Sequence, residues 1–296
     1  MKLLTFKATS HRTTPATIGT PVRSAAMESL TEQPGPIEVK TVGADWFANL
    51  SGLLNLKDPK AVQAGLTDRK EPIQIYTHVI RHPEHGFFLV DSGVSRRLVE
   101  DPASVGVGLM LRKFGGISDM RPAQSTAEVI AAEPTPLNGV FMTHLHLDHV
   151  SGFPDIPKDV PIYTGADEAE AGLFLNIVAQ GTNNHLLDGR PALEELQFTK
   201  DPDGKFEGVN DVFGDGSLFA ILTPGHTIGH VSYLARTATG AVLMTGDVSH
   251  TRWGWENVVE PGTFLAEREP SRQSLLALKA LSRRHPDMTV KLGHQA

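Results

Sequence analysis

The fold and chemistry of this chain turn on one stretch, Thr143-His144-Leu145-His146-Leu147-Asp148-His149-Val150. It has the pattern H-x-H-x-D-H and follows the apolar run Gly139-Val140-Phe141-Met142, which predicts a buried strand. Alternate side chains of extended backbone share a face, so His144 and His146 should point at one position. Asp148 and His149 are adjacent, and a turn there would direct both to a second position. Because imidazole and carboxylate are ligands that zinc-like ions prefer, the stretch predicts a metal centre.

Three further ligand-type residues follow glycines at the ends of expected strands. Strands over 217–223, 241–245 and 289–292 lead into Gly225-His226, Gly246-Asp247 and Gly293-His294. When strands alternate with helices, such ends can meet at one edge of a sheet. The candidate metal ligands are therefore seven: His144, His146, Asp148, His149, His226, Asp247 and His294.

A hairpin is expected from residues 73–80 and 87–90, and its second strand ends at Asp91. Asp91 has two interpretations of equal weight. Its carboxylate could accept a hydrogen bond from the back of a metal-bound imidazole, or it could cap a helix over 95–99. His230 lies four residues after His226, but Gly225 and Gly229 argue against a helix there, so we expect a supporting or structural role for it.

The remaining segments predict an α/β chain. Helices are expected over 125–132, 167–180 and 271–285, the last with Ser271 as its N-cap, and strands over 160–163 and 231–236. Residues 101–120 are apolar and rich in glycine, which suits a mobile lid or a substrate loop. Residues 181–216 are polar and are expected as a surface excursion in which His185 is solvated. Trp253 and Trp255 are expected either at a pocket mouth or, more simply, in buried packing.

Composition restricts the function classes. The 296 residues have no cysteine, which excludes thiolate nucleophiles and cysteine metal ligands. Net charge is −7 with no Lys/Arg cluster, so we expect no nucleic-acid partner. No apolar run is long enough for a membrane span, and no signal-type segment follows Met1 to Phe6, so we expect a cytoplasmic protein with no membrane partner.

Residues 1–40 are expected as an N-terminal arm or irregular lead-in, and residues 41–296 as a single catalytic domain. The arm and the apolar segments 46–56 and 106–114 offer contact surface for a homodimer. Each of these segments would equally suit the core or a lid.

The chain resembles the metallo-β-lactamase superfamily over about residues 70 to 294. The resemblance lies in the ordered motifs H-x-H-x-D-H, Gly-His, Gly-Asp and Gly-His. The Val90-Asp91-Ser92-Gly93 run and Thr143 also suit the superfamily pattern. The resemblance implies an αββα sandwich and two divalent metal ions, most simply zinc, with iron, manganese or cobalt as alternatives. It implies one metal on His144, His146 and His226, a second on Asp148, His149 and His294, and Asp247 between them.

Two such ions would lower the pKa of water enough to supply a hydroxide nucleophile, and Asp148 or Asp247 would carry a proton to the leaving group. Within the superfamily the chain is most similar to the N-acyl homoserine lactonases and related lactone or ester hydrolases. Those lactonases have a tyrosine shortly after the bridging aspartate. Here His250 stands in that neighbourhood and could donate the same hydrogen bond to the substrate, as in the organophosphate-hydrolysing branch. A glyoxalase II-like thioesterase, a mononuclear iron oxygenase like the persulfide dioxygenases, and a metal-stabilised protein without catalysis are the alternatives.

Overall fold

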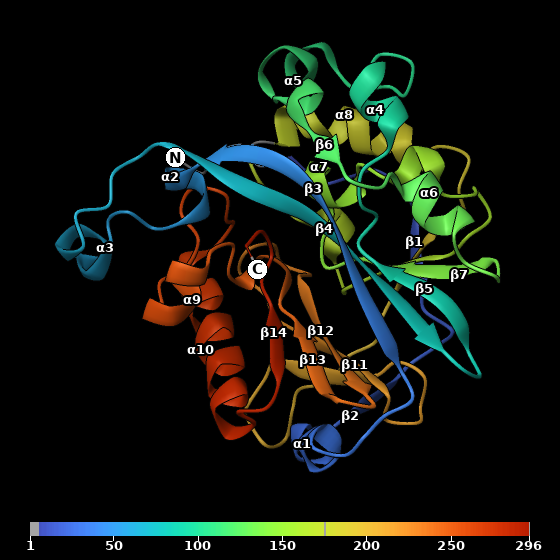
Figure 1. The fold of residues 1–296 in the computed structure, drawn as a ribbon, viewed down its shortest axis with the longest axis vertical. Coiled ribbons are helices and arrows are strands. Elements are labelled where there is room, and N and C mark those ends of the chain that lie inside the picture. The colour runs from blue at the N-terminus through green and yellow to red at the C-terminus, as the bar shows by residue number, and fades with distance from the viewer. Residues whose placement is uncertain (1–5, 175, 296) are drawn as a thin grey trace.

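Two sheets face each other in the computed structural model, which describes residues 6–174 and 176–295 (Figure 1). The first sheet holds eight strands in the order β1 (Thr13–Pro15), β9 (Leu193–Glu195), β8 (Ile162–Thr164), β7 (Leu137–Phe141), β5 (Gly86–Val90), β4 (Lys70–His82), β3 (Glu38–Asn49) and β6 (Arg121–Pro122). The second holds six in the order β14 (Thr289–Lys291), β13 (Gly240–Met244), β12 (Val231–Thr237), β11 (Leu218–Leu222), β10 (Gly208–Asp211) and β2 (Thr20–Val22).

Helices lie around both sheets. They are α1 (Ser24–Thr31), α2 (Leu50–Leu53), α3 (Pro59–Gln63), α4 (Arg96–Glu100), α5 (Leu109–Phe114), α6 (Thr126–Ala131), α7 (Leu147–Val150), α8 (Asn176–Leu187), α9 (Arg252–Asn257) and α10 (Arg268–Arg284). Of these, α10 and α1 pack against the second sheet. Figure 1 shows α10 beside the second sheet, with α4, α6 and α8 at the opposite side of the molecule. Among the described residues, no helix has both the length and the apolar character needed to cross a bilayer.

Three apolar clusters define the layers. One cluster fills the space between the sheets and includes Phe141 of β7 and Tyr233 of β12. A second lies between the first sheet and its helices, and Val140 of β7 belongs to it. A third joins the second sheet to α10 and α1. Neighbouring residues of a strand face opposite sides of the sheet. Val140 therefore packs toward the helices, and Phe141 packs between the two sheets. The expected α/β fold, an αββα sandwich, is confirmed.

The N-terminal segment differs from expectation, because residues 8–40 are not irregular. Strand β1 pairs with β9 in the first sheet, and β2 pairs with β10 in the second. Met27 of α1 is buried in the cluster under the second sheet. Each strand has only three residues, too few to show an alternating pattern, so composition alone predicted a lead-in. A boundary at residues 40/41 remains a prediction.

The helix expected over 167–180 was misplaced. A 3-10 turn covers Glu168–Glu170, and the long helix α8 runs from Asn176 to Leu187, into the stretch expected as a surface excursion. Strands β9 and β10 also lie within that excursion, although His185 is indeed exposed. The helix is expected too early in the chain because Phe174 and Ile177 have the spacing of a buried face. Both lie at the surface, whereas Leu186 and Leu187 of α8 are buried.

Most other expected elements are present, with shifted ends. The C-terminal helix starts at Arg268, so Ser271 lies inside α10 and Glu267 occupies the N-cap position. The segment from Met1 to Thr5, part of the stretch in which we expected no secretory signal, lies outside the described residues.

The inter-sheet core should dominate stability. Replacing buried Phe141 by alanine should lower the free energy of unfolding by about 3–5 kcal/mol, because a large side chain leaves a cavity between the sheets. The matched substitution Phe114→Ala, at a side chain 74% exposed on α5, should change it by less than about 0.5 kcal/mol. Urea denaturation of both variants measures the difference, and equal losses would contradict the layered core.

Candidate metal centre

Four chain segments bring the candidate ligands together. The loop after β7 and the start of α7 supply the H-x-H-x-D-H residues, while the ends of β11, β13 and β14 lead to His226, Asp247 and His294. The extended backbone stops at His146, and α7 begins at Leu147, which turns Asp148 and His149 as the motif predicted. All seven candidates fall into two groups that share Asp247.

The first group consists of His144, His146, His226 and Asp247. Nε2 of His226 lies 3.1 Å from Nε2 of His144 and 2.9 Å from Nδ1 of His146. Oδ2 of Asp247 is 3.2 Å from the same His226 nitrogen. Three ring nitrogens and one carboxylate oxygen thus converge on one small volume.

The second group consists of Asp148, His149, Asp247 and His294. Nε2 of His294 lies 3.4 Å from Oδ2 of Asp148 and 3.4 Å from Oδ1 of Asp247. Nε2 of His149 lies 3.4 Å from Oδ2 of Asp247. Oδ2 of Asp247 therefore faces both groups, while its Oδ1 faces His294 of the second group.

The chemistry of the donor set fits a pair of divalent cations. Within the described residues, Nε2 of His149 and Oδ1 of Asp247 are buried without a hydrogen-bond partner. In the first group, three imidazoles direct nitrogens at one another, and protons cannot satisfy all of these contacts at once. A cation bound between them would use every lone pair.

Burial keeps the histidines of the first group neutral. It lowers the pKa of His146 to about 4 and holds the pKa values of His144 and His226 well below the usual range. A neutral imidazole offers the lone pair that a metal ligand requires.

In the second group, nearby carboxylates determine the direction of the histidine pKa shifts. Burial lowers the pKa of His149, but the charges of Asp91, Asp247 and Asp148 outweigh burial and raise it well above the usual range. His294 has a raised pKa because Asp247 and Asp148 likewise outweigh its burial. Burial raises the pKa of Asp247, yet the surrounding histidines bring it well below the usual range. Metal ions would displace the protons of this group.

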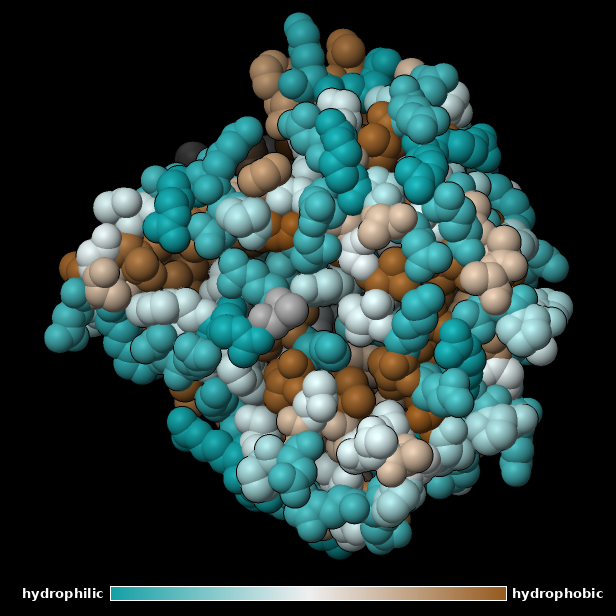
Figure 2. Space-filling model, viewed as in Figure 1, coloured by the Kyte–Doolittle hydropathy of each residue, from teal (hydrophilic) through white to brown (hydrophobic). Residues whose placement is uncertain are grey.

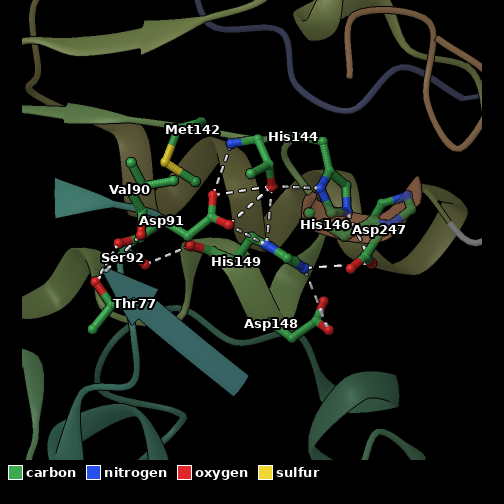
Figure 3. A network of polar contacts seen from close by, with 12 residues as sticks. Thr77, Val90, Asp91, Ser92, Met142, His144, His146, Asp148, His149 and Asp247 are labelled. Atoms are coloured by element: carbon green, nitrogen blue, oxygen red, sulfur yellow. Dashed lines mark hydrogen bonds and ion pairs between the residues drawn. The ribbon is translucent and has the colours of Figure 1, made fainter. Parts of the chain in front are cut away.

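Asp91 acts from behind His149, which resolves its two interpretations. Its Oδ2 lies 2.8 Å from Nδ1 of His149, and it also accepts hydrogen bonds from the backbone amide and hydroxyl of Thr143. Figure 3 shows one His149 nitrogen turned to Asp91 and the other to Asp148 and Asp247. Ser95 is the N-cap of α4, so Asp91 is not its cap.

His230 supports Asp247 through the backbone. Its Nε2 accepts the backbone N–H of Asp247 at 3.0 Å, and its Nδ1 lies 2.9 Å from the hydroxyl of Thr223. The ring is fully buried, and burial lowers its pKa to about 3, which keeps it neutral. The supporting role expected for His230 is therefore confirmed by its contacts.

His250 lies beside both groups but belongs to neither. Its Nδ1 lies 3.1 Å from the backbone oxygen of Leu53 and its Nε2 lies 3.0 Å from Oδ2 of Asp247. With Nδ1 donating to Leu53, only Nε2 faces the centre. Its catalytic role remains a prediction.

A cavity of about 490 Å³ opens onto the centre. Its walls include Asp148 and His250 together with Trp46, Met110 and Phe114. Figure 2 shows hydrophobic residues reaching the surface at the end of the molecule where α5 lies. The 101–120 segment expected as a mobile lid or substrate loop thus contributes to the mouth. Trp253 and Trp255 instead pack in apolar clusters, as the simpler interpretation proposed.

Sequence reasoning missed two anchors of the centre. Gln74 accepts a hydrogen bond from Nδ1 of His294 through its backbone oxygen, which no side-chain pattern can reveal. Glu168 is fully buried beside the ligand loops, and burial raises its pKa to about 7 against the hydrogen bonds that lower it. The only available signal was a carboxylate soon after a buried strand, which is a common pattern.

This fold and its histidine-rich centre define a class of metal-binding α/β sandwich proteins. The family model described as "Metallo-beta-lactamase superfamily" matches residues 71–294, and the chain belongs to this superfamily. It is 30% identical over 255 residues to a protein named N-acyl homoserine lactonase AttM from Agrobacterium fabrum strain C58, covering 82% of this chain and 90% of that protein.

Solved structures share the fold. An N-acyl homoserine lactone hydrolase with N-hexanoyl-L-homoserine bound at its catalytic metal centre superposes with a TM-score of 0.62 at 20% identity, over 88% of this chain and 94% of that one. AidC, described as a dizinc quorum-quenching lactonase, superposes with a TM-score of 0.53 at 14% identity, over 94% of this chain and 90% of that one.

Asp91→Asn tests the support of His149. Asparagine tolerates the left-handed backbone of this position (φ 58°), so the change chiefly replaces one carboxylate oxygen by an amide. We expect the affinity of one metal equivalent to fall about 10- to 100-fold. Zinc titration against a chromophoric chelator measures this change. Asp155→Asn, which alters a carboxylate holding Ser95 and the Ala127 amide, is the control and should leave zinc affinity unchanged.

Proposed function

We propose that this protein is a dinuclear metal-dependent lactonase that opens N-acyl homoserine lactones. The observation that carries the proposal is the pair of ligand groups joined by Asp247 at the floor of a largely apolar cavity. The lactonase relatives support the substrate class. The product described in the hydrolase structure, N-hexanoyl-L-homoserine, unites a polar head with an apolar chain, and this cavity offers both environments.

The cations, when bound, would polarise the ester carbonyl and lower the pKa of water so that it can attack at neutral pH. His144, His146 and His226 would hold one, Asp148, His149 and His294 the other, and Asp247 both. Asp148 is the carboxylate better placed to pass a proton to the leaving alkoxide, because its side chain is 17% exposed toward the cavity and that of Asp247 only 3%. His250 would direct its Nε2 to the substrate from the cavity wall.

The finer points of the proposal are the metal, the location and the assembly. We propose zinc, because imidazole and carboxylate ligands suit it and because AidC is described as dizinc. We also propose a cytoplasmic protein that pairs as a homodimer, with no membrane or nucleic-acid partner.

A substrate panel tests the proposal. Acyl homoserine lactones of several chain lengths, an aryl ester, a glutathione thioester and a phosphotriester are offered to the zinc-loaded protein. We expect the lactones to give the highest kcat/KM. A preference for the thioester or the phosphotriester would overturn the substrate assignment. If the protein binds two zinc ions but hydrolyses none of these esters, the proposal that it is a hydrolase is wrong.

Asp148→Asn should lower kcat on the best lactone by about 10²- to 10⁴-fold, because a proton acceptor and a ligand oxygen are lost together. Zinc content is measured alongside, so that loss of metal can be separated from loss of proton transfer. Activity at the wild-type level with both metals retained would exclude Asp148 from the reaction.

Phe114→Ala tests the apolar mouth. Phe114 lines the cavity from α5, and removing it should raise KM for a long-chain lactone by about fivefold, since roughly 1 kcal/mol of apolar contact is lost. The KM for a short-chain lactone should stay unchanged. Steady-state kinetics on the two substrates provide the comparison, and an equal change for both would place the chain elsewhere.

A further inference from the structure

Two loops that carry ligands of the first group meet at a side chain that belongs to neither. Oε1 of Glu168 accepts the backbone N–H of Leu145 at 2.9 Å. Its Oε2 accepts the hydroxyl of Thr227 at 2.7 Å and the backbone N–H of Gly229 at 3.1 Å. Leu145 stands between His144 and His146, and Thr227 follows His226 directly. One carboxylate therefore ties the two ligand loops together.

The surrounding backbone is shaped for this contact. A Cβ on Gly165 would lie 1.9 Å from the backbone oxygen of Gly229, and one on Gly229 would lie 2.7 Å from the nitrogen of Glu168. Only glycine permits so close an approach of the two loops. Asp167 has a left-handed conformation (φ 60°) immediately before Glu168.

The peptide of Leu145 is held from both sides. Its N–H is bound by Glu168, its carbonyl oxygen accepts from Nδ2 of Asn183 at 2.9 Å, and its side chain is buried in the core under the first sheet. These contacts hold the backbone of Leu145 in place, and with it the backbone positions from which the side chains of His144 and His146 extend. The ligands of the second group have other anchors, since His149 is held by Asp91 and His294 by Gln74.

We propose that Glu168 is a positioning residue of the first metal group, setting the distance between His144–His146 and His226. The inference rests on the proposed dinuclear centre and deepens it, because it assigns to the first group a support that, among the described residues, makes no hydrogen bond to His149 or His294. A carboxylate suits this task because it accepts from all three donors at once, whereas an amide would turn an N–H toward at least one of them.

Glu168→Gln tests the assignment on the full-length protein with zinc alone, titrated against a chromophoric chelator. One of the two zinc equivalents should bind about 10- to 100-fold more weakly, while the other keeps its wild-type affinity. The group that is weakened is identified from the visible spectrum of bound cobalt. His226→Ala provides the reference spectrum for the second group, and His294→Ala that for the first. At limiting cobalt, Glu168→Gln should show the second-group spectrum.

Asp201→Asn is the matched control. Asp201 is also buried and accepts backbone N–H groups, from Ser24, Lys205 and Phe206, but it lies at the start of α1. It should lower the melting temperature without changing either zinc affinity. If Glu168→Gln behaves in the same way, or weakens both metal equivalents equally, Glu168 only stabilises the fold and the assignment is wrong.

If Glu168→Gln fails to fold, Thr227→Val tests the positioning role of Glu168 instead. It removes one of the three hydrogen bonds and should weaken the same zinc equivalent by less than about tenfold, and Thr227→Ser should restore it. Unchanged zinc affinity in Thr227→Val would overturn the proposal. Fewer than two zinc ions in the wild type would instead overturn the dinuclear centre, so the two failures are distinguishable.

Discussion

The candidate metal centre depends on the burial of one carboxylate among imidazoles. Asp247 is 2% exposed, and Nε2 atoms of His144, His149, His226 and His250 lie 3.0–3.6 Å from its Oδ2. Burying a charge without compensation costs several kcal/mol. The other ring nitrogens of His149 and His250 are already engaged, with Asp91 and the Leu53 carbonyl. Protons or metal ions must therefore lie between Asp247 and the rings, and two divalent ions can satisfy both of its oxygens.

The double sheet provides the rigidity that this arrangement requires. The ligands come from the end of β7 in the first sheet and from the ends of β11, β13 and β14 in the second, so their spacing depends on how the sheets pack. The hydroxyl of Tyr233 on β12 donates to the carbonyl of Met142, directly before the motif. Thr143 is bound in turn by the backbone N–H of Val231. Hydrogen bonds thus join β12 of the second sheet directly to the start of the ligand motif.

The sequence predicted the centre better than it predicted its surroundings. The H-x-H-x-D-H motif and the three glycine–ligand pairs identified the residues that converge, because metal ligands require particular side chains at short spacings. Asp91 was visible for the same reason. By contrast, Gln74 acts through its backbone oxygen, and Glu168 becomes recognisable only when the loops of Leu145 and Gly229 are seen together. Strand β1 and the true position of α8 were missed because local pattern does not report pairing with distant segments.

The residues that would determine the type of reaction are held more tightly than those that would determine the choice of substrate. The ligand groups sit on strand ends whose neighbours are fixed by glycine contacts and buried hydrogen bonds, so little variation is compatible with them. The cavity wall comes instead from the end of β3, from α5 and from the start of α8, which carry the exposed Phe47 and Phe114 and the half-buried Val178. Side chains there have few partners to satisfy and can change without disturbing the centre. Substrate choice must therefore be sought in these wall residues and in His250.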